Sequence, residues 1–304
     1  MRTAVIGIGS NSVRMLVADV ADGKARQILR DREGTRLFAG LDEKHNLSEE
    51  SMTKTIEAVR RMASEARQLG AEQVDLFATS AVRDAANSDD LAARLKEKAQ
   101  VELEICPGEE EAALSFLGAT NGELCGVIDI GGGSTEIVVG QGENLMAAFS
   151  CQMGAVRLYG RIPIHSHADL PAVRQLAAAI LEDKLREHPT LTSPQHWIGV
   201  GGTFTTLAAM VRAIHWTDRT YMHGTCITKQ EIEQKAWYLS DMTLAERLRL
   251  PGLQPNRADI VVHGICILLA VMDRMNISEI TVSEYGNLHG YLKKKYHIQG
   301  EIQA

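Results

Sequence analysis

One short pattern occurs twice in the chain, and this repeat limits the fold more than any other feature of the sequence. Residues 4–20 read AVIGIGSNSVRMLVADV, and residues 126–139 read GVIDIGGGSTEIVV. In each copy, a turn of small polar residues separates two apolar runs that are typical of β-strands. Aligned without a gap, the copies share identical pairs: Val5 with Val127, Ile6 with Ile128, Ile8 with Ile130, Gly9 with Gly131, and Ser12 with Ser134.

Strands and helices are predicted to alternate after each copy. In the first half we expect strands at residues 3–8, 13–20, 25–30, 74–78 and 101–106, and helices at residues 49–69, 89–99 and from Pro107. In the second half, strand, turn and strand recur, followed by helices at residues 170–186, 229–241 and 258–276, and from Thr203 and Gly286. Strands are expected at residues 196–202 and 279–283. Two halves built alike predict two similar α/β domains with a cleft between them. Their expected bounds are residues 1–122 and 123–304, and the final helix can pack back on the first domain.

Composition excludes several classes of protein. The longest apolar run, residues 260–272, is interrupted by His263 and is shorter than a bilayer span of about 20 residues. The first residues lead directly into a strand with no secretory signal pattern, so a cytoplasmic protein is expected. The five cysteines form no CxxC pair, which favours buried thiols. The net charge of −7 argues against duplex nucleic acid as a partner.

Three glycine-rich turns are candidates for phosphate binding. Small residues let successive backbone N–H groups point at one anion, and hydroxyl groups add donors. The third turn, in GVGGTFTTL, also leads into a helix N-terminus. Each turn alone could be a tight connection that needs glycine for its backbone angles, but three in a repeated context favour phosphate. The candidate residues are Gly9, Ser10, Asn11, Ser12, Gly131, Gly132, Gly133, Ser134, Thr135, Gly201, Gly202 and Thr203.

The hairpins resemble those of the actin, hexokinase and sugar-kinase superfamily, and longer matches are similar to its exopolyphosphatase/guanosine pentaphosphatase (Ppx/GppA) branch. The matching segments are GSNSVRM, ATSAVRDAAN, PGEEEA, DIGGGSTE, MGAVRL, GVGGTFTTLAAM and RADIVVHG, in the family's order and across nearly the whole chain. The resemblance implies two ribonuclease H-like (actin-like ATPase) domains with an interdomain cleft, in the short two-domain form. It implies a phosphohydrolase that releases the terminal phosphate of inorganic polyphosphate or pppGpp.

The resemblance also implies roles for charged residues. Glu111, the last Glu of PGEEEA, matches the family's catalytic base, although helix-dipole stabilisation alone would also favour an acid there. Asp129 and Glu136 flank the second turn and are predicted to hold Mg²⁺, or Mn²⁺, with Glu136 also acting on the water. For Glu136 a solvated strand face is the alternative. Arg83 and Arg157 are predicted to bind phosphate oxygens.

Gly7 departs from the family pattern, because the first hairpin of the family reads DIGSNS. The resemblance therefore implies one acidic contributor fewer at the metal site. This favours an alternative, a non-hydrolysing sensor of polyphosphate or guanosine tetra- or pentaphosphate. A kinase of the same superfamily is a third hypothesis, disfavoured by PGEEEA and ATSAVRDAAN. Helix 258–276 is expected in an interdomain core or a dimer surface, so a homodimer is considered. Substrate preference and oligomeric state stay open.

Overall fold

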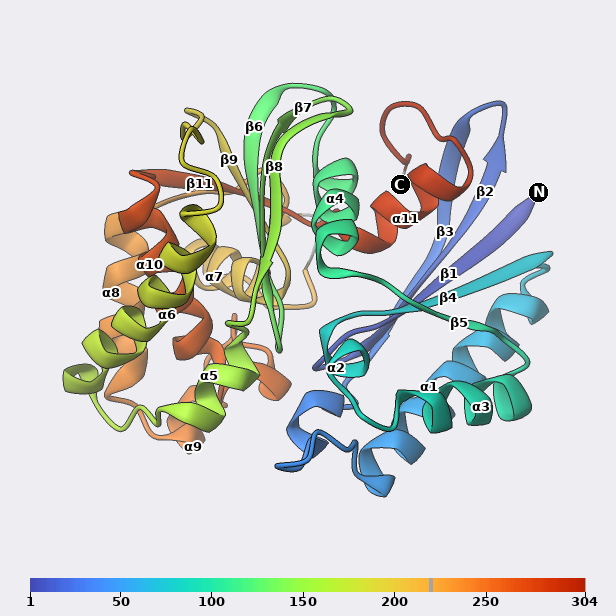
Figure 1. The fold of residues 1–304 in the computed structure, drawn as a ribbon, viewed down its shortest axis with the longest axis horizontal. Coiled ribbons are helices and arrows are strands. Elements are labelled where there is room, and N and C mark those ends of the chain that lie inside the picture. Colours follow the sequence, from blue (N-terminus) through green and yellow to red (C-terminus); the bar gives the residue numbers. More distant parts are fainter. Residues whose placement is uncertain (219–220, 304) are drawn as a thin grey trace. The chain divides into compact units, whose positions relative to one another are not determined.

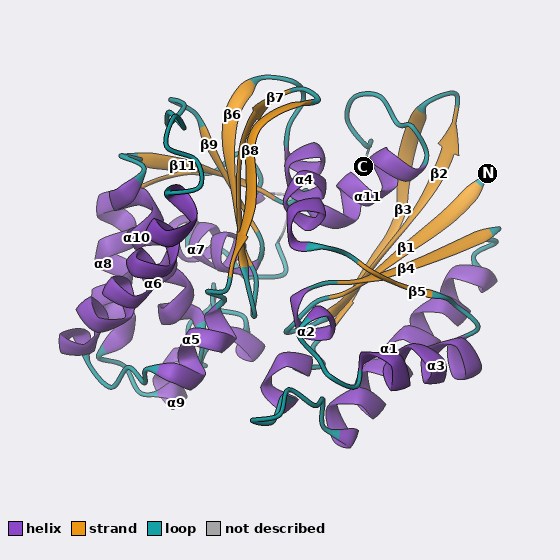
Figure 2. Cartoon of the chain, viewed as in Figure 1, coloured by secondary structure: helices purple, strands orange, loops and turns teal. Residues whose placement is uncertain are grey.

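The computed structural model describes residues 1–218 and 221–303, and its chain divides into two compact units (Figures 1 and 2). Unit 1 comprises Met1–Asn121 together with the segment that begins at Asn287. Unit 2 comprises Gly122–Gly286. The closing segment, although distant in sequence, is therefore part of the first unit.

A five-stranded mixed sheet forms the centre of unit 1. The strand order is β3-β2-β1-β4-β5, with β1, β2 and β3 antiparallel and with β4 and β5 parallel to β1. The strands are β1 (Arg2–Ile8), β2 (Val13–Ala21), β3 (Lys24–Glu33), β4 (Gln73–Ala78) and β5 (Leu103–Ile105). Every residue of β1 after Arg2 is buried, as expected for a central strand with both faces covered.

Helices cover both faces of this sheet (Figure 1). The helices of unit 1 are α1 (Glu49–Gln68), α2 (Ser80–Arg83), α3 (Ser88–Ala99), α4 (Gly108–Ala119) and α11 (Asn287–Lys295), with a 3₁₀ turn η1 (Leu37–Gly40). One apolar core joins α1 and α3 to alternate residues of β1, such as Ile6 and Ile8. A second core joins α4 and α11 to the other face of the sheet, which includes Val5 of β1 and Leu16 of β2. Ser48 caps α1 as predicted, because its side chain accepts a hydrogen bond from the Ser51 N–H.

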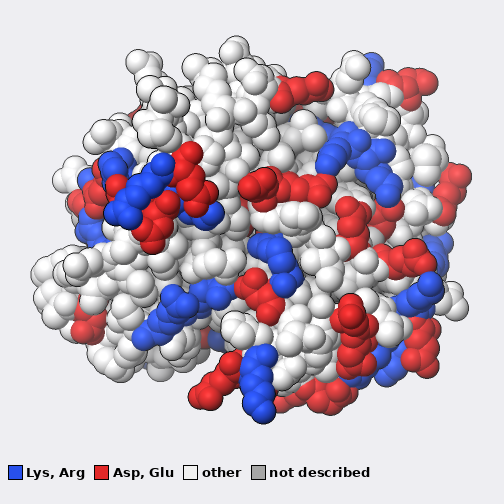
Figure 3. Space-filling view, in the orientation of Figure 1, with Lys and Arg blue, Asp and Glu red and all other residues white. Residues whose placement is uncertain are grey.

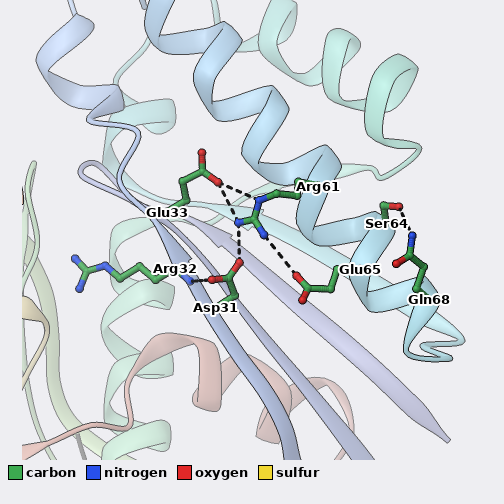
Figure 4. A network of polar contacts seen from close by, with 7 residues as sticks. All are labelled: Asp31, Arg32, Glu33, Arg61, Ser64, Glu65 and Gln68. Atoms are coloured by element: carbon green, nitrogen blue, oxygen red, sulfur yellow. Dashed lines mark hydrogen bonds and ion pairs between the residues drawn. The ribbon is translucent and has the colours of Figure 1, made fainter. Parts of the chain in front are cut away.

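A charged cluster also connects α1 to the outer strand β3 (Figure 4). The Arg61 guanidinium on α1 lies 2.7 Å from an Asp31 carboxylate oxygen and 3.0 Å from a Glu33 carboxylate oxygen, both on β3. It also lies 3.5 Å from Glu65, one turn further along its own helix. Because Arg61 is about half exposed, each pair contributes at most about 1 kcal/mol. The buried contacts beneath it therefore dominate the stability of this helix–sheet contact.

Unit 2 contains a six-stranded sheet with the same arrangement plus one edge strand. Its order is β10-β11-β9-β6-β7-β8. The strands are β6 (Leu124–Ile130), β7 (Thr135–Gln141), β8 (Asn144–Cys151), β9 (Trp197–Val200), β10 (Cys226–Thr228) and β11 (Glu279–Ser283). The pairs β6–β7 and β7–β8 are antiparallel, and β9 and β11 continue the sheet in parallel with β6. The antiparallel β10 pairs with β11 at the edge.

The most apolar helix of unit 2 is buried in that unit's own core. The helices are α5 (Ala155–Arg161), α6 (Leu170–Leu185), α7 (Gly202–Arg212), α8 (Lys229–Ser240), α9 (Leu244–Arg247) and α10 (Val261–Arg274), with 3₁₀ turns η2 (His167–Asp169) and η4 (Pro255–Arg257). Residues 261–272 of α10 are all buried, in a cluster shared with α6 and α8. The expectation that this helix lies in an interdomain core or a dimer surface is therefore wrong. In the described part of the chain, none of the helices has the length and apolar character needed to cross a membrane.

The two sheets confirm the predicted fold class and the internal repeat. Strands β3-β2-β1-β4-β5 correspond to β8-β7-β6-β9-β11 in order and direction. The irregularity in the ladder recurs as well, since β2 shifts register after Val17 and β7 shifts after the aligned Val139. No element was predicted for β8, β10 or α5. These elements are short or lack a clear apolar period, so the local pattern does not reveal them.

Candidate functional site

The first glycine turn is held from its carbonyl side. The Gly9 N–H donates to the Ser12 carbonyl at 3.0 Å and closes the turn between β1 and β2. From outside, the Phe38 N–H donates to the Ser10 carbonyl at 2.9 Å, and the Arg36 N–H donates to the Asn11 carbonyl at 3.1 Å. Because the C=O and N–H of a planar trans peptide point in opposite directions, the amides of Asn11 and Ser12 point away from this support. The prediction of an anion-binding turn is compatible with that direction.

The second turn is held in the same way by helix α5. The Gly131 N–H donates to the Ser134 carbonyl at 3.0 Å, which repeats the closure of the first turn. The carbonyls of Gly131, Gly132 and Gly133 then all accept bonds from α5: from Ala155 N at 3.0 Å, from Val156 N at 2.9 Å, from Arg157 N at 3.0 Å, and from Arg157 Nε at 2.6 Å. The amides of Gly132, Gly133 and Ser134 are directed away from α5. Arg157, predicted to bind phosphate, therefore uses its Nε to hold the turn.

The third turn brings a glycine against a predicted metal ligand. Gly201 ends the connection from β9 to α7 with a φ of 97°, which strongly favours glycine. A Cβ atom on Gly201 would lie 2.9 Å from the Asp129 Oδ1. Gly202 faces Arg257 so closely that a Cβ atom there would lie 1.7 Å from the guanidinium carbon. Arg257 was not among the predicted site residues, although it lies in the matching segment RADIVVHG.

Thr79 and Ser80 of unit 1 occupy the place that the third turn occupies in unit 2. Thr79 and Ser80 follow β4, which runs parallel to the central strand β1. Gly201 and Gly202 follow β9, which runs parallel to the central strand β6. Ser80 begins α2, and its hydroxyl lies 2.8 Å from the Ser10 hydroxyl in the first turn. Sequence reasoning singled out only Arg83 in this segment and expected it to begin a turn. It is instead the last residue of the one-turn helix α2.

Asp129 and Glu136 form a buried carboxylate pair beside the second turn. They are directly opposite one another in the β6–β7 ladder, so their side chains are on the same face of the sheet, with Cβ atoms about 5 Å apart. Asp129 is 8% exposed and Glu136 is 1% exposed, so the alternative of a solvated strand face for Glu136 is wrong. The Ser150 hydroxyl donates to Glu136 Oε1 at 2.7 Å.

This pair fits a magnesium ion. Two buried carboxylates side by side need compensating positive charge or donors. Among residues 1–218 and 221–303 there is no group of three or more His, Cys, Asp and Glu side chains that could hold a metal. Mg²⁺ does not require one, because it usually keeps several waters and binds through one or two carboxylates together with substrate phosphates. Asp129 and Glu136 would supply the protein ligands.

The matching positions of unit 1 have the opposite character. Gly7 is directly opposite Arg14 in the β1–β2 ladder, in the place of the Asp129–Glu136 pair. Arg14 donates from Nη2 to the Asn287 Oδ1 at 3.0 Å. A Cβ atom on Gly7 would lie 3.2 Å from the Phe77 ring, which is a tight contact. The first hairpin thus presents a guanidinium where the second presents carboxylates.

Glu111 is held by Arg83, the residue predicted to bind phosphate. Glu111 lies in the first turn of α4, as predicted, and is buried. The Arg83 Nη1 donates to the Glu111 Oε2 at 3.2 Å and to the Cys106 carbonyl at 2.7 Å. The Arg83 Nη2 is buried and has no hydrogen-bond acceptor among the described residues. Arg83 therefore bonds to Glu111 with one nitrogen, while its role in binding phosphate stays a prediction.

Helix α11 supports the helix that carries Glu111. A Cβ atom on Gly290 of α11 would lie 1.8 Å from the Leu114 carbonyl oxygen, so the close approach of α11 to α4 requires glycine. The buried Lys293 donates from Nζ to the Leu117 carbonyl at 3.0 Å, near the C-terminus of α4, where positive charge is favourable.

Burial, together with the negative charge of Glu111, raises the pKa of the Cys106 thiol to about 12. This thiol is therefore not a nucleophile near neutral pH.

Comparison with known proteins assigns the family. Residues 16–298 match the Ppx/GppA phosphatase family. This chain belongs to the Ppx/GppA phosphatase family. It is 35% identical over 314 residues to exopolyphosphatase 2 of Mycobacterium tuberculosis, covering 95% of this chain and 97% of that protein. It is 30% identical over 319 residues to exopolyphosphatase 1 of Mycobacterium bovis, covering 100% of this chain and 91% of that protein.

Solved structures of Ppx/GppA proteins have the same fold. An exopolyphosphatase from Cytophaga hutchinsonii superposes with a TM-score of 0.89 at 25% identity, covering all of both chains. The Ppx/GppA enzyme of Aquifex aeolicus superposes with a TM-score of 0.81 at 27% identity, covering 97% of this chain and 99% of that one. In this Ppx/GppA chain, each unit contains one pair of predicted charged site residues that lie side by side, in addition to its glycine turns. Unit 1 joins Glu111 to Arg83, and unit 2 joins Asp129 to Glu136.

Proposed function

We propose that this protein is a Mg²⁺-dependent exopolyphosphatase, which releases the terminal phosphate of inorganic polyphosphate. The observation that carries the proposal is the buried, in-register pair Asp129 and Glu136 beside a glycine turn whose amides point away from their support. Two relatives at 30% identity or more bear the name exopolyphosphatase, which supports the same substrate.

The roles of the residues follow from their chemistry. When bound at Asp129 and Glu136, Mg²⁺ would neutralise charge on the phosphoryl oxygens. The turn amides donate hydrogen bonds to phosphate, and the Arg83 Nη2 is suited to an anionic oxygen. A water oxygen bonds to the terminal phosphorus while the bridging P–O bond breaks, and the shortened chain leaves with the bridging oxygen. Glu111 accepts the proton of that water.

The surface charge limits the kind of anion that the protein can bind. On the face drawn in Figure 3, Lys and Arg side chains are interspersed with Asp and Glu. With a net charge of −7, a broad basic surface for duplex nucleic acid is not favoured. A cytoplasmic location and a homodimeric state stay predictions from the sequence.

Gly7 favours a second candidate function, non-hydrolysing binding of polyphosphate or guanosine tetra- or pentaphosphate. In place of the family's Asp, the first hairpin has Gly7 opposite the cationic Arg14. This arrangement preserves attraction for phosphate and removes one acidic group. The non-hydrolysing function is disfavoured by three buried acids that a simple binder of anions would not require: Glu111, Asp129 and Glu136.

Phosphate release from polyphosphate and from pppGpp, measured side by side, tests both candidates. The assay contains Mg²⁺, Mn²⁺ or EDTA, and we expect metal-dependent release from polyphosphate. Glu136→Gln should lower the rate at least about 10²-fold. Glu143→Gln is the matched control, because it removes an exposed carboxylate from the same β7–β8 hairpin and should leave the rate unchanged. Binding without release at any metal concentration would support the sensor, and release from pppGpp alone would reassign the substrate.

A further inference from the structure

The support of the second glycine turn depends on one residue outside the turn. Gly154 is the N-cap of α5, the helix whose first residues donate to the three glycine carbonyls. A Cβ atom on Gly154 would lie 2.2 Å from both the carbonyl carbon and the oxygen of Gly132, and 2.4 Å from the Gly133 nitrogen. These neighbours are backbone atoms, so no side-chain rotation can relieve the overlap. Only glycine at 154 allows α5 to approach the turn at this distance.

We propose that Gly154 is a positioning residue of the phosphate site, and that it acts by letting α5 set the direction of the turn amides. The inference rests on the proposed function, because it takes the turn of unit 2 as the group that binds a phosphate oxygen. Four hydrogen bonds from α5 engage the turn carbonyls, which directs the amides of Gly132, Gly133 and Ser134 away from the helix.

The connection before Gly154 is fixed as firmly as the helix after it. The Thr135 hydroxyl, at the start of β7, donates to the Met153 carbonyl at 2.5 Å. The Met153 N–H donates to the Cys151 carbonyl at 2.7 Å. Gly154 is therefore held on both sides and cannot move away from the turn at little cost. A Cβ atom at 154 would instead displace the turn.

Unit 1 contains a second example of the same arrangement. There the N–H groups of Arg36 and Phe38, around η1, donate to the carbonyls of Ser10 and Asn11. The two segments that support the turns both contain Arg-Leu followed by an aromatic residue, at 36–38 and 157–159, but one is a 3₁₀ turn while the other is an α-helix. Support from the carbonyl side is thus retained in both units although different backbone structures provide it. This recurrence indicates that the direction of the turn amides is the shared requirement.

The expected displacement is large enough to affect catalysis. Ordinary contacts of a Cβ atom begin near 3.4 Å, so Gly154→Ala must separate α5 from the turn by at least about 1 Å. A misplacement of about 1 Å can lower the rate of an enzyme about 10²-fold. Gly160, in the same helix, has no atom within 4 Å of its Cβ position and is exposed. Gly160→Ala is therefore a matched control with the same chemical change.

The test measures hydrolysis and amide direction separately. We expect Gly154→Ala to lower kcat/KM for polyphosphate about 10²-fold, with kcat affected more than KM, and Gly160→Ala to stay within about twofold of the parent. In protein labelled with ¹⁵N-glycine, inorganic tripolyphosphate should shift the amide signals of Gly132 and Gly133 in the parent and in Gly160→Ala. It should not shift them in a folded Gly154→Ala protein.

Arg157→Lys keeps the proposal testable if Gly154→Ala does not fold. Lysine retains the positive charge but cannot reproduce the Nε–H bond to the Gly133 carbonyl. The Gly133 carbonyl belongs to the same peptide as the Ser134 N–H, so the readout is the Ser134 amide in protein labelled with ¹⁵N-serine. Loss of the tripolyphosphate-induced shift at Ser134 in this variant supports the role of α5 in directing the turn amides, whereas a retained shift and an unchanged kcat overturn it.

The outcomes separate this inference from the proposed function. A parent protein that hydrolyses nothing but shows the amide shifts, with loss of the shifts in Gly154→Ala, supports the inference and refutes the exopolyphosphatase. A parent that hydrolyses polyphosphate, with Gly154→Ala equal to it in kcat and in the shifts, refutes the inference alone. Glycine amides that tripolyphosphate does not shift in the parent also overturn the inference.

Discussion

Replacing Glu111 with Gln tests the proposed proton acceptor with little change of shape. Glu111 and Arg83 are 7% and 19% exposed, and the Arg83 Nη1 donates to Glu111 and to the Cys106 carbonyl. The amide oxygen of Gln can still accept from Arg83, so this hydrogen bond is kept and loses its charge assistance. We expect a loss of about 1 kcal/mol of folding stability. The lost proton acceptance should lower kcat about 10²- to 10⁴-fold, equivalent to about 3 to 5 kcal/mol in the barrier.

The assay compares Glu111→Gln with Glu109→Gln, an exposed acid in the same first turn of α4. For both variants we would measure kcat and KM for polyphosphate at saturating Mg²⁺, tripolyphosphate binding by calorimetry, and the thermal midpoint. Glu111→Gln should bind tripolyphosphate within about threefold of the parent while kcat falls, because it removes an interaction of the transition state. A kcat within threefold of the parent, in a folded protein, would refute the assignment of Glu111 as the base.

Three further predictions follow from the register of the hairpins, the third turn and the thiols. Gly7→Asp should leave the Mg²⁺ concentration for half-maximal activity within about threefold of the parent, because Arg14 directly opposite pairs with the new carboxylate. A markedly lower Mg²⁺ concentration for half-maximal activity would contradict this. Gly201→Ala should lower the free energy of unfolding by at least about 1 kcal/mol, because the φ of residue 201 is 97°. It should also raise the Mg²⁺ concentration for half-maximal activity, because the new Cβ would press on Asp129. An unchanged Mg²⁺ titration counts against Asp129 as a ligand. At pH 8, a thiol reagent should modify the exposed Cys226 in the native protein and all five cysteines after unfolding, and rapid native labelling of more than one thiol refutes this. Burial raises the pKa of the other four thiols to about 12: Cys106, Cys125, Cys151 and Cys266.

Much of the fold could be predicted because its signals are local. Helix α1 has a cap at Ser48, an apolar face of regular period and a glycine stop, so its ends were predicted closely. The repeat predicted two like units, and the shared strand order confirms them. Helix α5 was missed because a seven-residue helix has too few turns to show a period.

The predicted site residues were identified by type and motif, but their partners could not be. That Arg83 donates to Glu111 depends on α2 and α4 meeting beside β5, which no local pattern encodes. Arg257 lies 55 positions after Gly202 in the chain and rests on it only because η4 returns to the start of α7. Such contacts join segments distant in sequence, so they appear only when the chain is folded.

By itself, the sequence determined the repeat, the small residues of the turns and the acids next to them, because these depend on residue type and on spacing along one strand. Only the tertiary structure decided what the acids and turns face. The ladder placed Asp129 and Glu136 on one buried face, and it placed Gly7 opposite Arg14 in the other unit. The physical reason is that pairing across strands, and the approach of α5 to Gly132, depend on backbone packing between distant segments, which residue type alone does not specify.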